Sequence, residues 1–155
     1  MNDRPGDDLP EATFSHFAVC TSDLERSTRF YAQALGCSVE KQLEIGAPFD
    51  RLTEVEGLEA RTVFMLNGGV TIELLGYTMP GVIGPAERRP MNQLGITHMA
   101  FTIADLEKTA AKIDELGGTA LRETLVSGPM GEMMFAVDPD GTRLELWQKP
   151  ANAAG

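Results

Sequence analysis

Apolar and polar side chains alternate in two short segments of the chain, HFAVC at 16–20 and HMAFTI at 98–103. This alternation is typical of a strand with one face packed on a core. Each segment leads into the tripeptide DLE and then into a stretch closed by Leu-Gly, LERSTRFYAQALG at 24–36 and LEKTAAKIDELGG at 106–118. Acidic residues at the start, and a glycine that accepts a left-handed conformation at the end, predict a helix for each stretch.

The similarity between these segments is part of an internal duplication of the chain. Aligning SHFAVCTSDLERS with THMAFTIADLEKT places His16 opposite His98 and matches the two DLE tripeptides. Further on, VTIELLG aligns with TRLELWQ and places Glu73 opposite Glu145, each after a turn sequence, NGG or DPDG. The remaining strands are predicted at 38–44 and 61–67, and at 119–126 and 133–139. The order of elements is therefore βαβββ in each copy, which is an α+β fold.

A length of 155 residues suits one domain in which the two copies share a core. We expect a single domain over 14–149, made of a first module at 14–76, a linker at 77–95 and a second module at 96–149. The linker is rich in Pro and Gly, so we expect it to wrap the surface, where it could act as a lid. Flexible tails are expected at 1–13 and 150–155.

The period of two places the histidines on the strand face that carries small residues. His16 shares its face with Ala18 and Cys20, while larger apolar residues point to the opposite face, where the following helix can pack. Glu73 and Glu145 point with the histidines for the same reason. If both modules line one concave surface, the two histidines and the two glutamates converge there.

Two imidazoles and two carboxylates form a suitable ligand set for a divalent metal of intermediate softness, and His16, Glu73, His98 and Glu145 are the candidates. Taken singly, each is more simply interpreted as a packed histidine or an ion-paired glutamate. The metal interpretation gains from their joint occurrence, since the only two histidines of the chain occupy equivalent positions of the duplication. Burying four ionisable groups without a metal would also be costly.

Charge and motifs exclude several other functions. The formal net charge of −10 repels the phosphates of nucleic acids and anionic lipid headgroups. No apolar run is long enough for a membrane span, no signal-peptide pattern opens the chain, and Cys20 and Cys37 lack the spacing of a redox pair, so a cytoplasmic location is expected. Nucleophile and nucleotide motifs such as GxSxG, GxGxxG and GxxxxGK[ST] are absent.

With these segments in hand, the chain resembles the vicinal oxygen chelate superfamily of glyoxalases, methylmalonyl-CoA epimerases, extradiol dioxygenases and antibiotic resistance proteins. The resemblance covers about residues 14–149 and rests on SHFAVCTSDLERSTRFYAQALG, VTIELL, GITHMAFTIADLEKTAAKIDELGG and FAVDPDGTRLELWQ. It implies two βαβββ modules in an open, cupped, eight-stranded mixed sheet. It also implies a metal on the inner surface, with the family's ligand positions falling on His16, Glu73, His98 and Glu145.

The ligand set most resembles that of bacterial glyoxalase I. This implies a lyase or isomerase that moves a proton next to a carbonyl chelated by nickel, zinc, cobalt or manganese, with Glu73 or Glu145 as the base. The substrate would be a small molecule with adjacent oxygens, and a homodimer is expected. A glutamate at position 73 disfavours extradiol dioxygenases and fosfomycin-modifying enzymes, whereas an epimerase and a small-molecule binding or resistance protein remain alternatives. LLGYTMP follows Glu73 in place of the Thr-x-Asn segment that helps glyoxalase I to hold glutathione.

Overall fold

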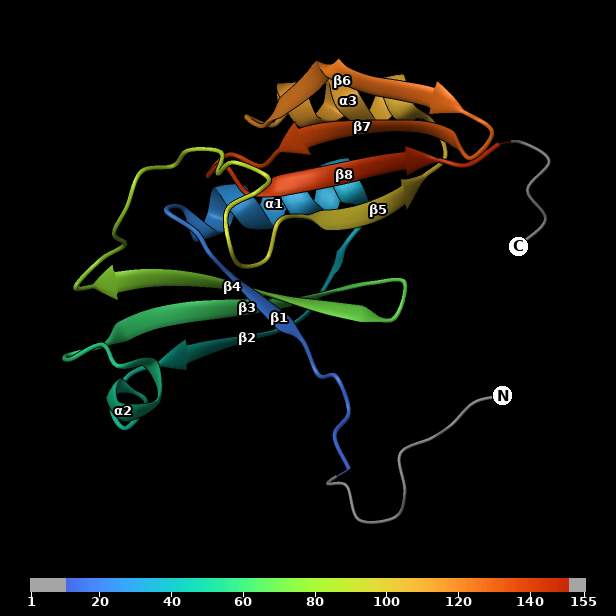
Figure 1. Cartoon of the computed structure of the whole chain (residues 1–155). Coiled ribbons are helices and arrows are strands. Elements are labelled where there is room, and N and C mark those ends of the chain that lie inside the picture. The colour runs from blue at the N-terminus through green and yellow to red at the C-terminus, as the bar shows by residue number, and fades with distance from the viewer. Residues whose placement is uncertain (1–10, 151–155) are drawn as a thin grey trace.

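The computed structural model describes residues 11–150, and its elements follow the predicted order twice (Figure 1). The first module contains β1 (Phe17–Cys20), α1 (Leu24–Leu35), β2 (Ser38–Ile45), α2 (Asp50–Thr53), β3 (Glu59–Asn67) and β4 (Val70–Met79). The second contains β5 (Met99–Ile103), α3 (Leu106–Glu115), β6 (Thr119–Gly128), β7 (Gly131–Val137) and β8 (Arg143–Gln148). The predicted tails lie almost wholly outside the described residues.

Eight strands form two open, four-stranded mixed sheets, in the orders β1-β4-β3-β2 and β5-β8-β7-β6. In each sheet the histidine strand pairs in parallel with the glutamate strand, and the other pairs are antiparallel. The registers are equivalent, because Ala18 lies opposite Glu73 and Ala100 lies opposite Glu145. The predicted α+β fold with two βαβββ modules is confirmed.

The long helices begin where the sequence predicts. Asp23 and Asp105 cap α1 and α3, since each carboxylate accepts a hydrogen bond from the backbone N–H three residues later at 2.9 Å. Gly36 ends α1 in the left-handed conformation, at φ 70°. Several strand ends differ from the prediction: β3 begins at Glu59, β4 and β6 run on to Met79 and Gly128, and β7 spans Gly131–Val137 instead of 133–139. The single turn α2 was not predicted, because four residues carry too little periodicity.

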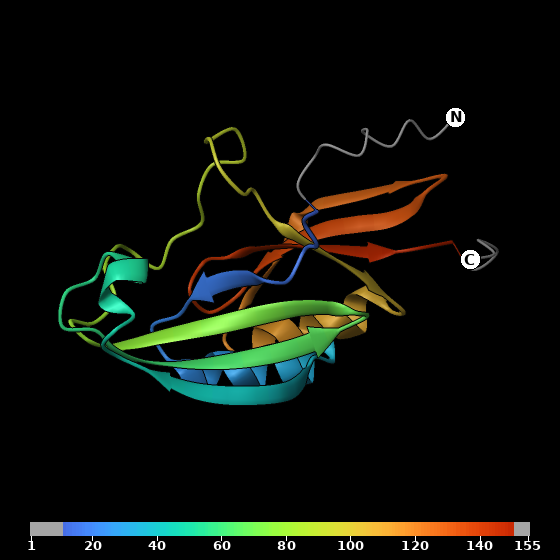
Figure 2. The same ribbon diagram turned by 90° about the horizontal axis from the view of Figure 1, so that it is seen from below.

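One core joins the two modules. α1 packs on β2, β3 and β4, α3 packs on β6, β7 and β8, and the two helices also contact each other (Figures 1 and 2). The large apolar side chains between these layers, including Phe30 and Ile113, are fully buried. The opposite face of each sheet, which carries the histidine and the glutamate, is not covered by either long helix.

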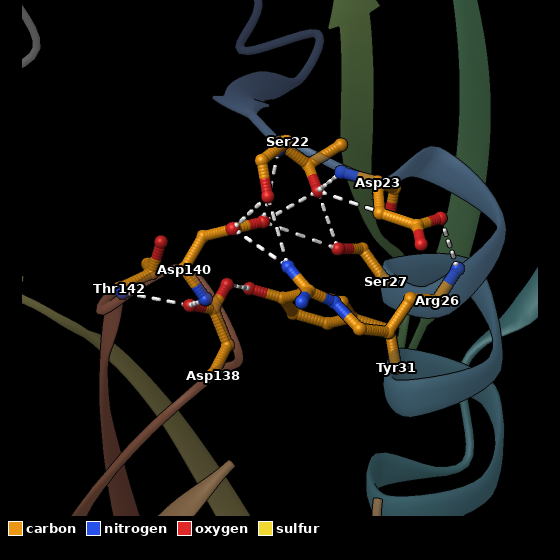
Figure 3. A network of polar contacts seen from close by, with 9 residues as sticks. Ser22, Asp23, Arg26, Ser27, Tyr31, Asp138, Asp140 and Thr142 are labelled. Atoms are coloured by element: carbon orange, nitrogen blue, oxygen red, sulfur yellow. Dashed lines mark hydrogen bonds and ion pairs between the residues drawn. The ribbon is translucent and has the colours of Figure 1, made fainter. Parts of the chain in front are cut away.

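A polar network fixes the start of α1 to the turn between β7 and β8 (Figure 3). Asp140 accepts hydrogen bonds from Thr21 Oγ1 at 2.6 Å, Ser22 N at 3.1 Å and Arg26 Nη2 at 2.8 Å. Burial alone would raise the pKa of Asp140, but the hydrogen bonds from Ser22 and Thr21 and the charge of Arg26 outweigh it and lower the pKa. The DPDG sequence therefore does more than turn the chain, because it ties the second module to the first.

A second aspartate of the same turn is buried against α1. Tyr31 donates a hydrogen bond to Asp138 at 2.9 Å, and Asp138 also accepts from the backbone N–H of Thr142 at 2.7 Å. Burial raises the pKa of Asp138 and, together with the adjacent carboxylate, raises that of Tyr31 well above its ordinary value.

Within residues 11–150, no helix combines the length and the apolar character that crossing a membrane would require.

Candidate metal centre

The four candidate ligands lie at equivalent places in the two sheets. His16 immediately precedes β1 and His98 immediately precedes β5, while Glu73 and Glu145 lie on the adjacent strands β4 and β8. His16 Nε2 is 3.1 Å from Glu73 Oε2, and His98 Nε2 is 3.0 Å from Glu145 Oε2. The parallel pairing of two neighbouring strands therefore brings one imidazole and one carboxylate together in each module.

A hydroxyl group orients each imidazole from its other side. Ser15 Oγ lies 3.0 Å from His16 Nδ1, and Thr97 Oγ1 lies 2.9 Å from His98 Nδ1. A partner at Nδ1 directs Nε2 toward the carboxylate, as is usual for histidines that bind metals. The signal was in the duplication, where a hydroxyl residue precedes the histidine in both copies, but the sequence prediction did not include it.

An aromatic ring also supports each histidine. Phe64 packs edge-to-face on His16 and Phe135 packs similarly on His98, with ring centroids 5.5 Å apart in both cases. Phe64 lies opposite Glu73 and Phe135 lies opposite Glu145 in the sheet registers. Each half of the site is thus a unit of one hydroxyl, one imidazole, one carboxylate and one phenyl ring.

The two glutamates differ in how firmly they are held. Thr62, which is 1% exposed, donates a hydrogen bond from Oγ1 to Glu73 Oε1 at 2.8 Å. The corresponding position of the second module, two residues before Phe135, is occupied by Met133, which has no hydroxyl. In the described part of the chain, His98 is the only polar partner of the Glu145 carboxylate. Glu145 is therefore the less restrained of the two carboxylates.

The structure brings the ligands together as two pairs within one chain. No group of three or more His, Cys, Asp or Glu side chains among the described residues is close enough to hold a metal ion. Each pair nevertheless suits a metal. Two donor atoms at about 2.1 Å from an ion, on adjacent corners of an octahedron, are about 3.0 Å apart, which matches both Nε2–Oε2 distances.

Three other residues with reactive or polar side chains have simpler roles. Partial burial and the charge of Asp140 raise the pKa of Cys20, so its thiol is not activated. Trp147 Nε1 donates to the Met130 carbonyl at 2.8 Å, which fixes the indole at the end of β8. Arg61 pairs with Glu25 at 3.1 Å on the surface.

Similar proteins support the fold. A glyoxalase family protein of Bacillus cereus is 16% identical and superimposes with a TM-score of 0.82 over 93% of this chain and 98% of its own. A point variant of the fosfomycin resistance protein FosX of Listeria monocytogenes, solved with Mn(II) and a dihydroxypropylphosphonic acid, is 18% identical, with a TM-score of 0.58 over 90% of this chain and 94% of its own. At these identities the similarity shows a shared fold.

Curated relatives are closer in sequence. A probable lactoylglutathione lyase of Vibrio cholerae is 29% identical over 147 residues, which is 90% of this chain and 93% of the relative. Two further bacterial relatives, 29% and 26% identical, are named uncharacterized proteins. Residues 13–146 match the sequence model of the family as a whole. The chain therefore belongs to the Glyoxalase/Bleomycin resistance protein/Dioxygenase superfamily.

Proposed function

We propose that this protein is a metal-dependent lyase or isomerase of the glyoxalase type, which transfers a proton at the carbon next to a carbonyl group of a small molecule with adjacent oxygens. Members of its superfamily are often enzymes and typically use a divalent metal. The observation that carries the proposal is the pair of equivalent His–Glu units, with donor atoms 3.1 and 3.0 Å apart.

We infer that one complete site takes His16 and Glu73 from one chain and His98 and Glu145 from a second copy. Each chain supplies two pairs that do not form a single group among its described residues. In a two-fold dimer, a contact between the first pair of one chain and the second pair of the other is necessarily made twice. Two chains would then hold two metals, each with four protein ligands.

A divalent ion such as nickel, zinc, cobalt or manganese would act at this site as a Lewis acid that makes the C–H bond beside a carbonyl more acidic. The histidines would serve as ligands, since the hydroxyls of Ser15 and Thr97 aim each Nε2 at the shared position. The proton would be taken by a glutamate. Glu145 suits this role better than Glu73, because it has no partner equivalent to Thr62 and can move.

Complementation between variants tests the shared site. The double variants His16→Ala/Glu73→Ala and His98→Ala/Glu145→Ala are each expected to lose the metal, measured by mass spectrometry after gel filtration. Unfolding and refolding an equal mixture should restore about a quarter of the parental metal, because half of the dimers are mixed and each has one intact site of two. Glu115→Ala, an exposed carboxylate on α3, is the control and should retain the parental content.

The outcomes separate the parts of the proposal. A parent that contains no divalent metal and cannot be loaded with one would contradict the metal mechanism. Two variants that each retain metal would contradict the four-ligand site, and a mixture that restores none would contradict sharing between chains. For a parent that does bind metal, hemithioacetals and 2-substituted acyl thioesters are the first substrates to assay.

A further inference from the structure

A cavity of about 780 Å³ lies beside His98, and several positively charged side chains line it. It is lined by β1, by the segment that joins the two modules, and by the turn between β7 and β8. Three arginines line it, Arg88, Arg89 and Arg143, in a chain whose formal net charge is −10. A local concentration of cations in an acidic protein calls for an explanation.

Arg143 is buried without a carboxylate. The residue is only 9% exposed, yet no Asp or Glu among residues 11–150 lies within ion-pair distance of its guanidinium. One hydrogen bond is made, from Nη2 to the carbonyl oxygen of Arg89 at 2.7 Å. Among the described residues, the buried side-chain nitrogen that lacks a hydrogen-bond partner is Arg26 Nε, and no nitrogen of Arg143 is in that state. The remaining N–H groups of Arg143 are therefore accessible and available to the cavity.

The three guanidinium groups in this cavity have no fixed counter-charge among the described residues. None of them forms an ion pair within residues 11–150. The carboxylates that line the same cavity are Glu87 and Asp140. Asp140 already binds Arg26, Thr21 and Ser22, and Glu87 forms no ion pair with a described residue.

Arg143 also lies on the face of the proposed metal site. It precedes Glu145 by two positions on β8, so both side chains project from the same face of the sheet. Its guanidinium stacks over the Phe135 ring at 5.1 Å, and the same ring packs against His98. One phenyl ring thus separates the buried guanidinium from the imidazole.

The segment that joins the modules is held in place to complete the cavity. Arg89 donates from Nη2 to the carbonyl oxygen of Leu94 at 2.7 Å, while its own carbonyl accepts from Arg143. Gly141 packs against the backbone of Glu87 so closely that an added Cβ would lie 2.6 Å from it. Arg88 and Arg89 are therefore carried by a segment that is anchored to β8 and its preceding turn.

We propose that Arg143, together with Arg88 and Arg89, binds an anionic group of the substrate, a carboxylate or a phosphate, while the reacting carbonyl lies at the His98–Glu145 pair. The inference rests on the proposed function for the reaction, and it adds the substrate class: small oxygen-rich molecules that carry a negative charge. A planar guanidinium can bind both oxygens of such a group, which fixes its orientation toward Glu145.

Anion titrations of the full chain test this subsite, followed by the shifts of backbone amide signals in NMR spectra. Inorganic phosphate and acetate are the probes, used on the protein as purified and again after treatment with a chelator. Arg143→Gln should weaken binding of the preferred anion about tenfold or more, since a hydrogen-bonded charge pair is lost. Arg88→Gln/Arg89→Gln tests the same site with exposed residues, in case Arg143→Gln is poorly folded.

Arg122→Gln is the matched control, because it removes one positive charge from a surface arginine that pairs with Asp114 and Glu107. It should bind the anion as the parent does. Tighter binding of phosphate than of acetate would assign a phosphate substrate, and the reverse a carboxylate. Binding that is unaffected in both arginine variants, or that disappears with the metal, would overturn the proposal. The measurement on chelator-treated protein separates this proposal from the metal mechanism. Anion binding that persists without metal and requires the arginines supports the subsite even if the metal mechanism fails.

Discussion

Replacing Asp140 with alanine should destabilise the protein more than any surface substitution, although Asp140 lies in a turn. Its side chain is 9% exposed and accepts hydrogen bonds from Thr21, Ser22 and Arg26 of the first module. Alanine would remove the acceptor that these donors share, leaving Thr21 and Arg26 only their other bonds, such as those to Asp23 O and Ser22 Oγ. It would also remove the counter-charge of Arg26, whose Nε already lacks a partner. The network in Figure 3 would then lose the carboxylate that connects its members.

The magnitude follows from the burial of the pair. Breaking a buried ion pair by removing one member costs about 3–5 kcal/mol. Arg26 is 36% exposed, so water compensates part of this loss, and we expect a decrease of about 2–4 kcal/mol in the free energy of unfolding. Against a total stability of about 5–15 kcal/mol this is a large fraction.

The effect of Asp140 should depend on pH in a defined direction. Its pKa is lowered in the folded protein, so the stability that it contributes is complete above the unfolded pKa of about 3.9 and is lost as the pH falls through the folded value. The difference in stability between the parent and Asp140→Asn should therefore be full at neutral pH and should shrink below about pH 4.

Urea denaturation followed by circular dichroism measures both effects. Glu115→Ala removes an exposed carboxylate that pairs with Lys112, and it should change stability by less than about 0.5 kcal/mol. A loss below about 1 kcal/mol for Asp140→Ala, or a loss that is the same at pH 7 and pH 3 for Asp140→Asn, would refute the reasoning. Such a result would mean that water replaces the hydrogen bonds of Asp140 at little cost in stability.

Three further predictions concern single positions. Thr62→Val should lower metal affinity by about tenfold, measured by competition with a chelator, because Glu73 loses its hydrogen bond. In the native protein Cys20 should react with a thiol reagent at pH 8 and Cys37 should not, because Cys20 is exposed, whereas Cys37 is buried and its pKa is raised to about 11. Gly118→Ala should cost about 1–3 kcal/mol in thermal unfolding, since its Cβ would lie within 3 Å of three atoms of the core.

Each of these has a matched control. Met133→Leu changes the position that corresponds to Thr62 and should leave metal affinity intact. Gly128→Ala places its Cβ in open space and should leave the melting temperature unchanged within experimental error. Both cysteines should react once the protein is unfolded. Equal reactivity of the two thiols in the native protein, or an equal effect of each variant and its control, would contradict the corresponding prediction.

Most of the fold was available from the sequence because the duplication tests every assignment twice. A weak strand pattern such as HFAVC gains support from HMAFTI, and two equivalent DLE tripeptides place both helix starts. The exceptions are local. The turn α2 has no counterpart in the second module, and the extension of β4 to Met79 depends on pairing with β3, which a pattern within one strand cannot report.

The pairing of each histidine with a glutamate was predictable from the sequence, whereas the metal site built from the four residues stays a prediction. Period-two alternation correctly placed each histidine on the face of a glutamate, and the structure forms both pairs. What alternation could not supply are contacts across strands, such as Thr62 to Glu73, and contacts between modules, such as Arg143 to Arg89. These depend on register and on the path of the joining segment, neither of which has a period.

The placement of one His–Glu pair relative to the other depends on different contacts from those that form each pair. Each His–Glu pair is made within one sheet, by two parallel neighbours, so it depends only on that module. The placement of one pair relative to the other is set by the shared core and by the Asp140 network, which joins α1 to the turn before β8. In a two-fold dimer both pairs of each chain must meet their counterparts at once, so this placement would decide whether both metal sites can close together. Loosening the network by Asp140→Ala should therefore lower metal affinity even though no ligand is changed, whereas a site completed within one module would be unaffected.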